Sequence, residues 1–222
     1  MKQIDKVKRL VVFDVETTGL NPKVDEIIDF GAVVCERKGE VWHVVENVNT
    51  LVQTTRPISP EIVEITGITT AMSVTGIAQH ELARTVERLL APGTLVVAYN
   101  LQFDIAFVDA LMHRFGAGFK FACDVLDMMT VYKDTHPYPH RLENALERFG
   151  IDNVSAHRAH ADAVATWDLL VQMQESHDID AYINVIGYHS RYGLKGPRYD
   201  HVVYVPQTFT QGSVKAVLSK RR

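Results

Sequence analysis

A run of apolar, β-forming residues that ends in two carboxylates constrains the fold of this chain more than any other feature. Residues 10–13 predict a buried strand, and Asp14 and Glu16 follow with one residue between them. Because side chains i and i+2 of a strand point to the same face, the two carboxylates project together. Such a pair repels and loses hydration unless a cation or a shared proton offsets the cost. The pattern favours a site for Mg²⁺ or Mn²⁺, although a solvated or helix-capping acid pair has the same spacing.

The composition is that of an ordinary globular protein. Its 222 residues, 46% hydrophobic and 23% charged, suffice for one buried domain and an appendage. The formal charge of −4 argues against a protein that coats nucleic acid by bulk electrostatics, but it leaves room for a local basic path. Cys35 and Cys123 indicate neither a zinc site nor a disulfide framework. The charged N-terminus and the lack of a long apolar run predict a soluble cytoplasmic protein without membrane association.

The predicted elements begin with an antiparallel meander. Residues 26–35 and 41–52 predict two strands that follow the first strand and are joined by a polar turn. Ser59 as N-cap and Pro60 at the first position begin a short helix, which Gly67 ends. The later predictions are a helix at 76–90, a strand at 94–99, a strand at 121–126, and helices at 142–149 and 179–186.

Two later segments carry acids that can complete a metal site. Residues 100–108 have helical spacing directly after the fourth strand, which places Asp104 in the first turn of a helix. The helix dipole alone favours an acid there, so Asp104 by itself does not establish a site. Residues 156–167 predict a helix whose small residues allow close packing, with Asp162 near its start and His157 in the preceding loop. Taken singly, such a histidine is more often a surface or hydrogen-bonded core residue.

Together these segments resemble the three exonuclease motifs of the DEDDh family, the DnaQ-like branch of the ribonuclease H-like superfamily. The blocks FDVETTGL, AYNLQFDIAFV and AHRAHAD agree with the motifs in order and spacing, over about residues 11–170. The resemblance implies an α/β fold with a mixed five-stranded sheet, in which antiparallel strands 1–3 are followed by parallel strands, with helices on both faces. It makes His157 the general base, since the sibling branch has a tyrosine where this chain has Arg158. The implied catalytic metal ligands are Asp14, Glu16, Asp104 and Asp162.

This set of residues suits phosphodiester hydrolysis. The reaction needs a nucleophilic water, stabilisation of charge on the phosphate and help for the leaving oxygen, and two divalent cations, Mg²⁺ or Mn²⁺, can supply all three. His157 can take the proton of the water at neutral pH, whereas His160 would point elsewhere on the helix. The resemblance also implies residues that contact the terminal nucleotide: Thr17, Thr18, Gly19, Leu20, Asn100 and Phe103.

Two departures from the family leave the base and sugar preference open. The family often has His-Asn before its second motif, where this chain has Tyr99-Asn100, and His-Gly-Ile after its short helix, where this chain has Thr66-Gly67-Ile68. Neither departure touches a predicted metal ligand, so they do not argue against activity. Both lie where the terminal base would rest.

The chain divides by pattern into an exonuclease domain at residues 1–176 and a C-terminal helix with a basic and aromatic extension at 177–222. Residues 187–199 interleave aromatic and basic side chains. Such a mix can stack bases and bind phosphates, but it can equally wrap across its own domain or a partner.

The favoured function is a metal-dependent 3′–5′ exodeoxyribonuclease that releases nucleoside monophosphates from DNA with a free 3′ end, with single strands preferred. It would act in repair, or in proofreading with a DNA polymerase or another replication protein. The alternatives are an exoribonuclease of the ribonuclease T or oligoribonuclease kind, a phosphoaspartyl phosphatase, and a non-catalytic nucleic-acid-binding subunit. A homodimer is neither required nor excluded by the sequence.

Overall fold

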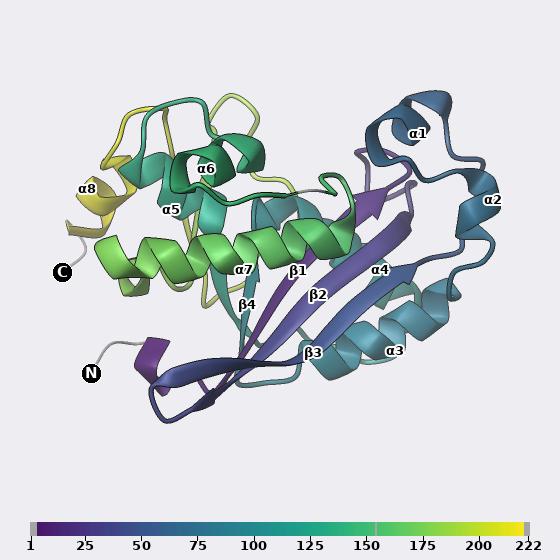
Figure 1. Ribbon diagram of the computed structural model, residues 1–222, viewed down its shortest axis with the longest axis horizontal. Coiled ribbons are helices and arrows are strands. Elements are labelled where there is room, and N and C mark those ends of the chain that lie inside the picture. The colour runs from purple at the N-terminus through teal and green to yellow at the C-terminus, as the bar shows by residue number, and fades with distance from the viewer. Residues whose placement is uncertain (1–3, 154, 220–222) are drawn as a thin grey trace.

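The computed structural model describes residues 4–153 and 155–219, and its centre is a five-stranded sheet (Figure 1). The strands of the sheet are β1 (Arg9–Thr17), β2 (Ile27–Lys38), β3 (Val41–Leu51), β4 (Thr94–Ala98) and β5 (Asp124–Asp127). Their order is β3-β2-β1-β4-β5. Strand β2 is antiparallel to both β1 and β3, whereas β4 is parallel to β1 and β5 is parallel to β4. The predicted α/β fold, a meander followed by parallel strands, is confirmed.

Helices cover both faces of this sheet. The α-helices are α1 (Pro60–Thr66), α2 (Thr70–Ser73), α3 (Gln79–Leu89), α4 (Leu101–Phe115), α5 (Met128–Thr135), α6 (Leu142–Phe149), α7 (Ala159–Ser176) and α8 (Ser213–Ser219). Helices α5, α6 and α7 pack on one face, whereas α3 and α4 pack on the other (Figure 1). Ser59 caps α1 and Gly67 ends it in the left-handed region, as predicted. Among the described residues, no helix is long and apolar enough to cross a membrane.

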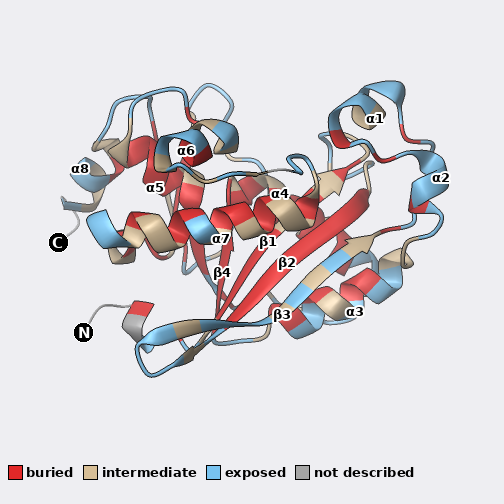
Figure 2. Cartoon of the chain, viewed as in Figure 1, coloured by how far each residue is buried: buried red, intermediate tan, exposed pale blue. Residues whose placement is uncertain are grey.

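Strand β1 is apolar without interruption from Leu10 to Phe13 because it contributes to two cores. Leu10 and Val12 pack under α5, α6 and α7, whereas Val11, Phe13 and Val15 pack under α3 and α4. Figure 2 shows β1, β2 and β4 buried along most of their length, and β3 more exposed at the edge. By this alternation, the side chains at positions 14 and 16 fall on the α7 face of the sheet.

Helix α7 begins in very close contact with β2 at Gly31, which pairs with Asp14 of β1. A Cβ atom at Gly31 would overlap the backbone of Ala159 and His160. Only glycine therefore lets the first turn of α7 come this near to the sheet. This close approach brings the start of α7 to the carboxyl end of β1.

The variant Gly31→Ala is expected to be less stable and less active. Its methyl group forces α7 away from β2, and overpacking of this kind costs about 1–3 kcal/mol. Thermal denaturation and nuclease assays measure the two effects. Gly39→Ala is the control for activity: a Cβ there meets open space, but the φ of 65° strains alanine, so we expect a loss of stability without a loss of activity. Equal effects of the two variants on activity would contradict a positioning role for Gly31.

Two sequence predictions need correction. The strand expected at 121–126 is shorter and later, since β5 is Asp124–Asp127. The helix expected at 179–186 is a short 3₁₀ turn, η2 (Ile179–Tyr182), followed by the strand β6 (Val185–Tyr188). Asn184 has a φ of 59° between them and donates its side-chain amide to Asp124, which stops the helix.

The chain after Ser176 packs on the same core as the preceding part. Strand β6 pairs in parallel with β7 (Val203–Pro206). Tyr182, Val205 and Val214 are buried in the cluster that also holds Leu10 and Val12 of β1. A domain boundary at residue 176 stays a prediction.

Candidate active site

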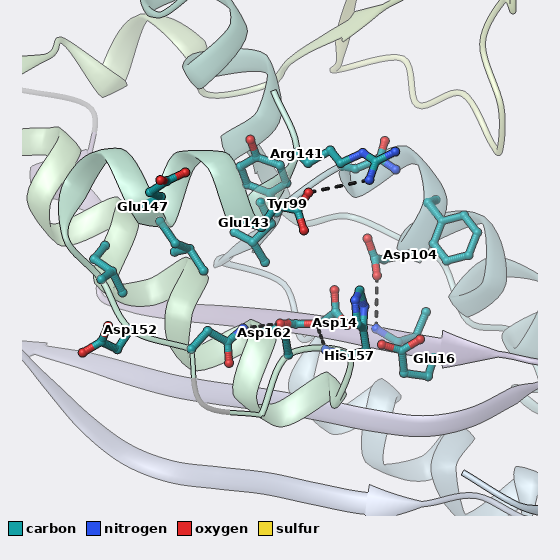
Figure 3. A pocket seen from close by; sticks show the side chains of 18 residues that line it. Asp14, Glu16, Tyr99, Asp104, Arg141, Glu143, Glu147, Asp152, His157 and Asp162 are labelled. Carbon is teal, nitrogen blue, oxygen red and sulfur yellow. Dashed lines mark hydrogen bonds and ion pairs between the residues drawn. The ribbon is translucent and has the colours of Figure 1, made fainter. Parts of the chain in front are cut away.

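The predicted catalytic residues from four separate segments meet at one cavity of about 600 Å³ at the end of β1 (Figure 3). The residues of that prediction that line it are Asp14, Glu16, Asp104, His157 and Asp162. Figure 3 shows their side chains turned toward one another from β1, α4, α7 and the loop before α7. The geometry therefore agrees with the grouping that the sequence motifs indicate.

Asp104 is held rigidly between α4 and β1. It is buried, at 2% exposed, and its Oδ1 accepts a hydrogen bond of 3.1 Å from the backbone N–H of Val15. The start of α4 is fixed by Asp127, whose Oδ1 accepts from the backbone N–H groups of Asn100 and Leu101. Asp127 is thus a structural acid, and by fixing the start of α4 it sets the position of Asp104.

Asp162 is oriented by the loop that precedes α7. Its Oδ1 accepts a hydrogen bond of 2.5 Å from the side-chain amide of Asn153, and its Oδ2 accepts one of 3.2 Å from the backbone N–H of His157. His157 has a φ of 63°, and its side chain is exposed at the cavity. Ligand atoms of Glu16, His157 and Asp162 all lie within 4.8 Å of one another.

An ion pair with a buried aspartate fixes the entry of the chain into α7. Asp29 pairs with Glu16 across β1 and β2 and is fully buried. Its Oδ2 accepts hydrogen bonds from Arg158 Nε at 2.8 Å and from the backbone N–H of Ala159 at 3.3 Å. The cationic guanidinium of Arg158 thus lies near the carboxylate cluster. Its ion pair with Asp29 also holds Arg158, the residue next to His157, against β2.

The carboxylates of the site are held near one another at an electrostatic cost. Burial, followed by repulsion from Asp162 and Asp29, raises the pKa of Glu16 to about 8. Burial and then the charges of Asp104 and Asp162 raise the pKa of Asp14 well above its ordinary value. Burial likewise raises the pKa of Asp104 and of Asp162.

The side chains fit a hard divalent cation. The carboxylates of Asp14 and Glu16 receive no hydrogen bond from any described residue, although each faces the cavity. The donor set consists of carboxylate oxygens with one imidazole at the rim, which is the chemistry that Mg²⁺ and Mn²⁺ accept. A cation would offset the repulsion that raises these pKa values.

Binding of Mn²⁺ or Mg²⁺ is expected to raise the melting temperature more at about pH 8.5 than at about pH 6. In the metal-free protein, Glu16 has a pKa of about 8, above its ordinary 4.5. Its contribution to stability is therefore present at low pH and is lost as the pH rises toward 8. Metal needs the ionised carboxylate, so its binding is favoured at the higher pH. Thermal denaturation with and without metal measures this, and an equal rise at both pH values would contradict the electrostatic account. Glu16→Gln should remove most of the difference.

The predicted nucleotide contacts divide into two groups. Asn100 and Phe103 line the cavity. The hydroxyl of Thr17 donates to the carbonyl of Gly19 at 2.6 Å, and that of Thr18 donates to Asp25 at 3.2 Å, so both stabilise the turn after β1. Leu20 projects from this turn and is 80% exposed, beside a second cavity. The role of the turn in binding stays a prediction.

Sequence reasoning missed residues that support or surround the site. Asn153 and Asp29 orient Asp162 and the start of α7, but neither belongs to a motif. One side of the cavity also carries charged side chains from α6 and its flanking loops: Arg141, Glu143, Glu147 and Asp152 (Figure 3). The periodicity of residues 142–149 predicts the helix, but it does not indicate that this helix borders the site.

Known proteins place the chain in a family. A model of an exonuclease family matches residues 11–170, which span all the motifs. The chain belongs to the DnaQ-like 3′–5′ exonucleases of the ribonuclease H-like superfamily.

Among individual relatives, the DNA polymerase III subunit epsilon of Treponema pallidum is 32% identical over 168 residues, which cover 74% of this chain and 76% of the relative. A DNA polymerase III of the PolC type from Caldanaerobacter subterraneus is 33% identical over 168 residues, but these cover only 11% of that much longer protein. Among solved structures, exonuclease I of E. coli in complex with a dT13 oligonucleotide superposes with a TM-score of 0.65 and 21% identity, over 75% of this chain and 41% of that one. That likeness shows a shared fold.

Proposed function

We propose that this 3′–5′ exonuclease removes nucleoside monophosphates from the 3′ end of single-stranded DNA in a reaction that depends on two divalent cations. The convergence of four carboxylates and a histidine at one cavity carries this proposal. The relatives that cover most of the chain are subunits or parts of DNA polymerases, which favours DNA over RNA.

The residues have distinct roles in the proposal. Asp14, Glu16 and Asp162 would hold one cation, and Asp14 together with Asp104 would hold the other. When bound, such cations activate a water molecule and stabilise charge on the phosphate. His157 accepts the proton of the attacking water from its place at the cavity rim. Asn100 and Phe103 line the space next to the carboxylates and contact the terminal nucleotide.

Shortening of matched DNA and RNA strands tests the reaction and its substrate class. Single strands of one sequence, labelled at the 5′ end, are incubated with Mg²⁺, with Mn²⁺ or with EDTA. We expect a ladder that shortens from the 3′ end with either metal, and faster shortening of DNA. A faster reaction on RNA would instead support the exoribonuclease alternative, and no ladder on either strand would contradict the proposal.

We also infer that the chain works beside a DNA polymerase. Support comes from the relatives, one a polymerase III subunit and others polymerase chains that contain a similar segment. Co-purification with the polymerase of the same cell tests this inference. An exonuclease that elutes only as a free protein, with the polymerase elsewhere, would contradict it.

A further inference from the structure

A second cavity, of about 430 Å³, adjoins the first along helix α4. Asn100 and Phe103 line both cavities, so the two are neighbours across the first turn of α4. The second cavity then follows α4 past Ala106 and Phe107. Its opposite wall is the segment of residues 187–196, which lies beyond the part of the chain that the exonuclease family model matches.

The segment 187–196 is fastened to α4 by Gln102. The side-chain amide of Gln102 donates to the carbonyl of Gly187 at 2.9 Å, and its Oε1 accepts from the backbone N–H of Lys195 at 3.2 Å. Gly196, with a φ of 90°, lies so near that a Cβ would be 3.0 Å from the Cβ of Ala106. The second cavity is therefore built by fixed contacts between the C-terminal segment and the helix that carries Asp104.

The charge of the second cavity is opposite to that of the first. None of the described residues that line it carries a carboxylate, whereas Lys133 and Lys195 both face it. Lys133 is only 7% exposed, and it makes no hydrogen bond or ion pair with any described residue. The nearby Asp127 is already occupied by four donors, including the hydroxyl of Thr130 at 2.6 Å. A buried ammonium without a hydrogen-bonding partner among the described residues favours an anionic ligand.

Exposed aromatic rings continue outward from this cavity. His189 and Tyr192 line it, with ring centroids 5.1 Å apart. His189 is 5.5 Å from Phe209, which is 5.4 Å from Tyr138. Of the four strongly exposed phenylalanine and tyrosine side chains among the described residues, three belong to this row: Tyr138, Tyr192 and Phe209. The ammonium of Lys133 lies 5.7 Å from the ring of Phe209, so a basic side chain lies beside this row of rings. Aromatic rings next to basic side chains are typical of grooves that stack the bases of a single strand.

We propose that the second cavity and its aromatic row hold the substrate strand upstream of the terminal nucleotide. The phosphate of the preceding nucleotide binds at Lys133 and Lys195, and the bases stack on Tyr192 and the rings beyond it. The aromatic row extends outward from the second cavity, which suits a strand that continues over several nucleotides. A terminal nucleotide alone would need only one closed site. This inference rests on the proposed exonuclease function and adds that the C-terminal segment selects single strands.

Two substrates separate this binding from catalysis. One substrate is an oligothymidylate of eight nucleotides. The other is the p-nitrophenyl ester of thymidine 5′-monophosphate, in which p-nitrophenol takes the place of all nucleotides upstream of the bond that is cleaved. For Lys133→Met, Lys195→Ala and Tyr192→Ala, we expect kcat/KM on the oligonucleotide to fall roughly tenfold, as for a lost stacked base or charge-assisted contact. Hydrolysis of the ester should stay within about twofold of the wild type, because the ester has no group to reach these side chains.

Salt dependence and a distant lysine complete the test. In Lys133→Met and Lys195→Ala, the slope of log kcat/KM against log salt should be less steep by about 0.7, the effect of one phosphate contact to a single strand. Lys38→Ala, at the exposed end of β2, should leave both the slope and the rate unchanged. Because Lys195 and Tyr192 are exposed, their variants test the proposal even if Lys133→Met does not fold.

The outcomes distinguish the two levels of the argument. A wild-type protein that hydrolyses neither substrate would overturn the proposed function itself, and the strand path with it. A wild type active on both substrates, with variants that lose nothing or lose both activities equally, would overturn only the strand path.

Discussion

Asp14→Asn is expected to abolish exonuclease activity and, at the same time, to make the metal-free protein more resistant to heat. Asp14 lies at the centre of the site, where burial and then the charges of Asp104, Asp162 and Glu16 raise its pKa. The amide keeps the shape of the side chain but cannot serve as an anionic metal ligand. Loss of a shared ligand should lower kcat by about 10³-fold or more, because each cation supplies several kcal/mol of charge stabilisation.

The stability gain in Asp14→Asn follows from the same repulsion. A buried carboxylate among three others opposes folding, and its neutral isostere removes that cost. We expect a rise of a few degrees in the metal-free melting temperature, as about 1 kcal/mol gives for a chain of this size. Asp168→Asn, on the exposed side of α7, is the matched control and should change neither quantity. Activity within about tenfold of the wild type would contradict the role of Asp14.

His157→Asn is expected to lower kcat by about 10²–10⁴-fold while it leaves metal affinity nearly unchanged. Asparagine suits the test because His157 has a φ of 63°, a conformation that asparagine tolerates better than alanine. The backbone N–H that orients Asp162 is retained in the variant. A loss of turnover can therefore be assigned to the imidazole and not to a displaced carboxylate.

Metal titration by calorimetry decides between two roles for His157. If His157 is the general base, its replacement changes turnover but not the affinity for Mn²⁺. Its ring lies close enough to Glu16 and Asp162 to act as a ligand instead. A parallel loss of metal affinity and turnover would show that the imidazole is a ligand, whereas unchanged turnover would remove it from the mechanism. His160→Asn is the control, since His160 contacts Asn47 on β3.

The sheet and the gathering of five predicted side chains at one cavity could be predicted from sequence for a physical reason. Strand alternation alone puts Asp14 and Glu16 on one face, and the end of a parallel strand leads directly to the helix that carries Asp104. These relations are local, or they follow from the order of strands. The motif spacing then selects His157 and Asp162.

The supporting contacts could not be predicted because they depend on how distant segments meet. Asn153 reaches Asp162 only through the shape of the loop before α7. Asp29 gains its role from Arg158, 129 positions later. The apolar segment around Val185 suits either a helix or a strand, and its partner β7 decides for the strand. In each case the deciding contact is tertiary.

Anomalous diffraction from crystals grown with Mn²⁺ and thymidine 5′-monophosphate tests the central claim most directly. The claim is that Asp14, Glu16, Asp104 and Asp162 hold two cations at the end of β1. We expect two manganese peaks in this cavity, one beside Asp14, Glu16 and Asp162, and the other on the side of Asp14 that faces Asp104. A single peak among Glu16, His157 and Asp162, with none at Asp14 or Asp104, would contradict the account.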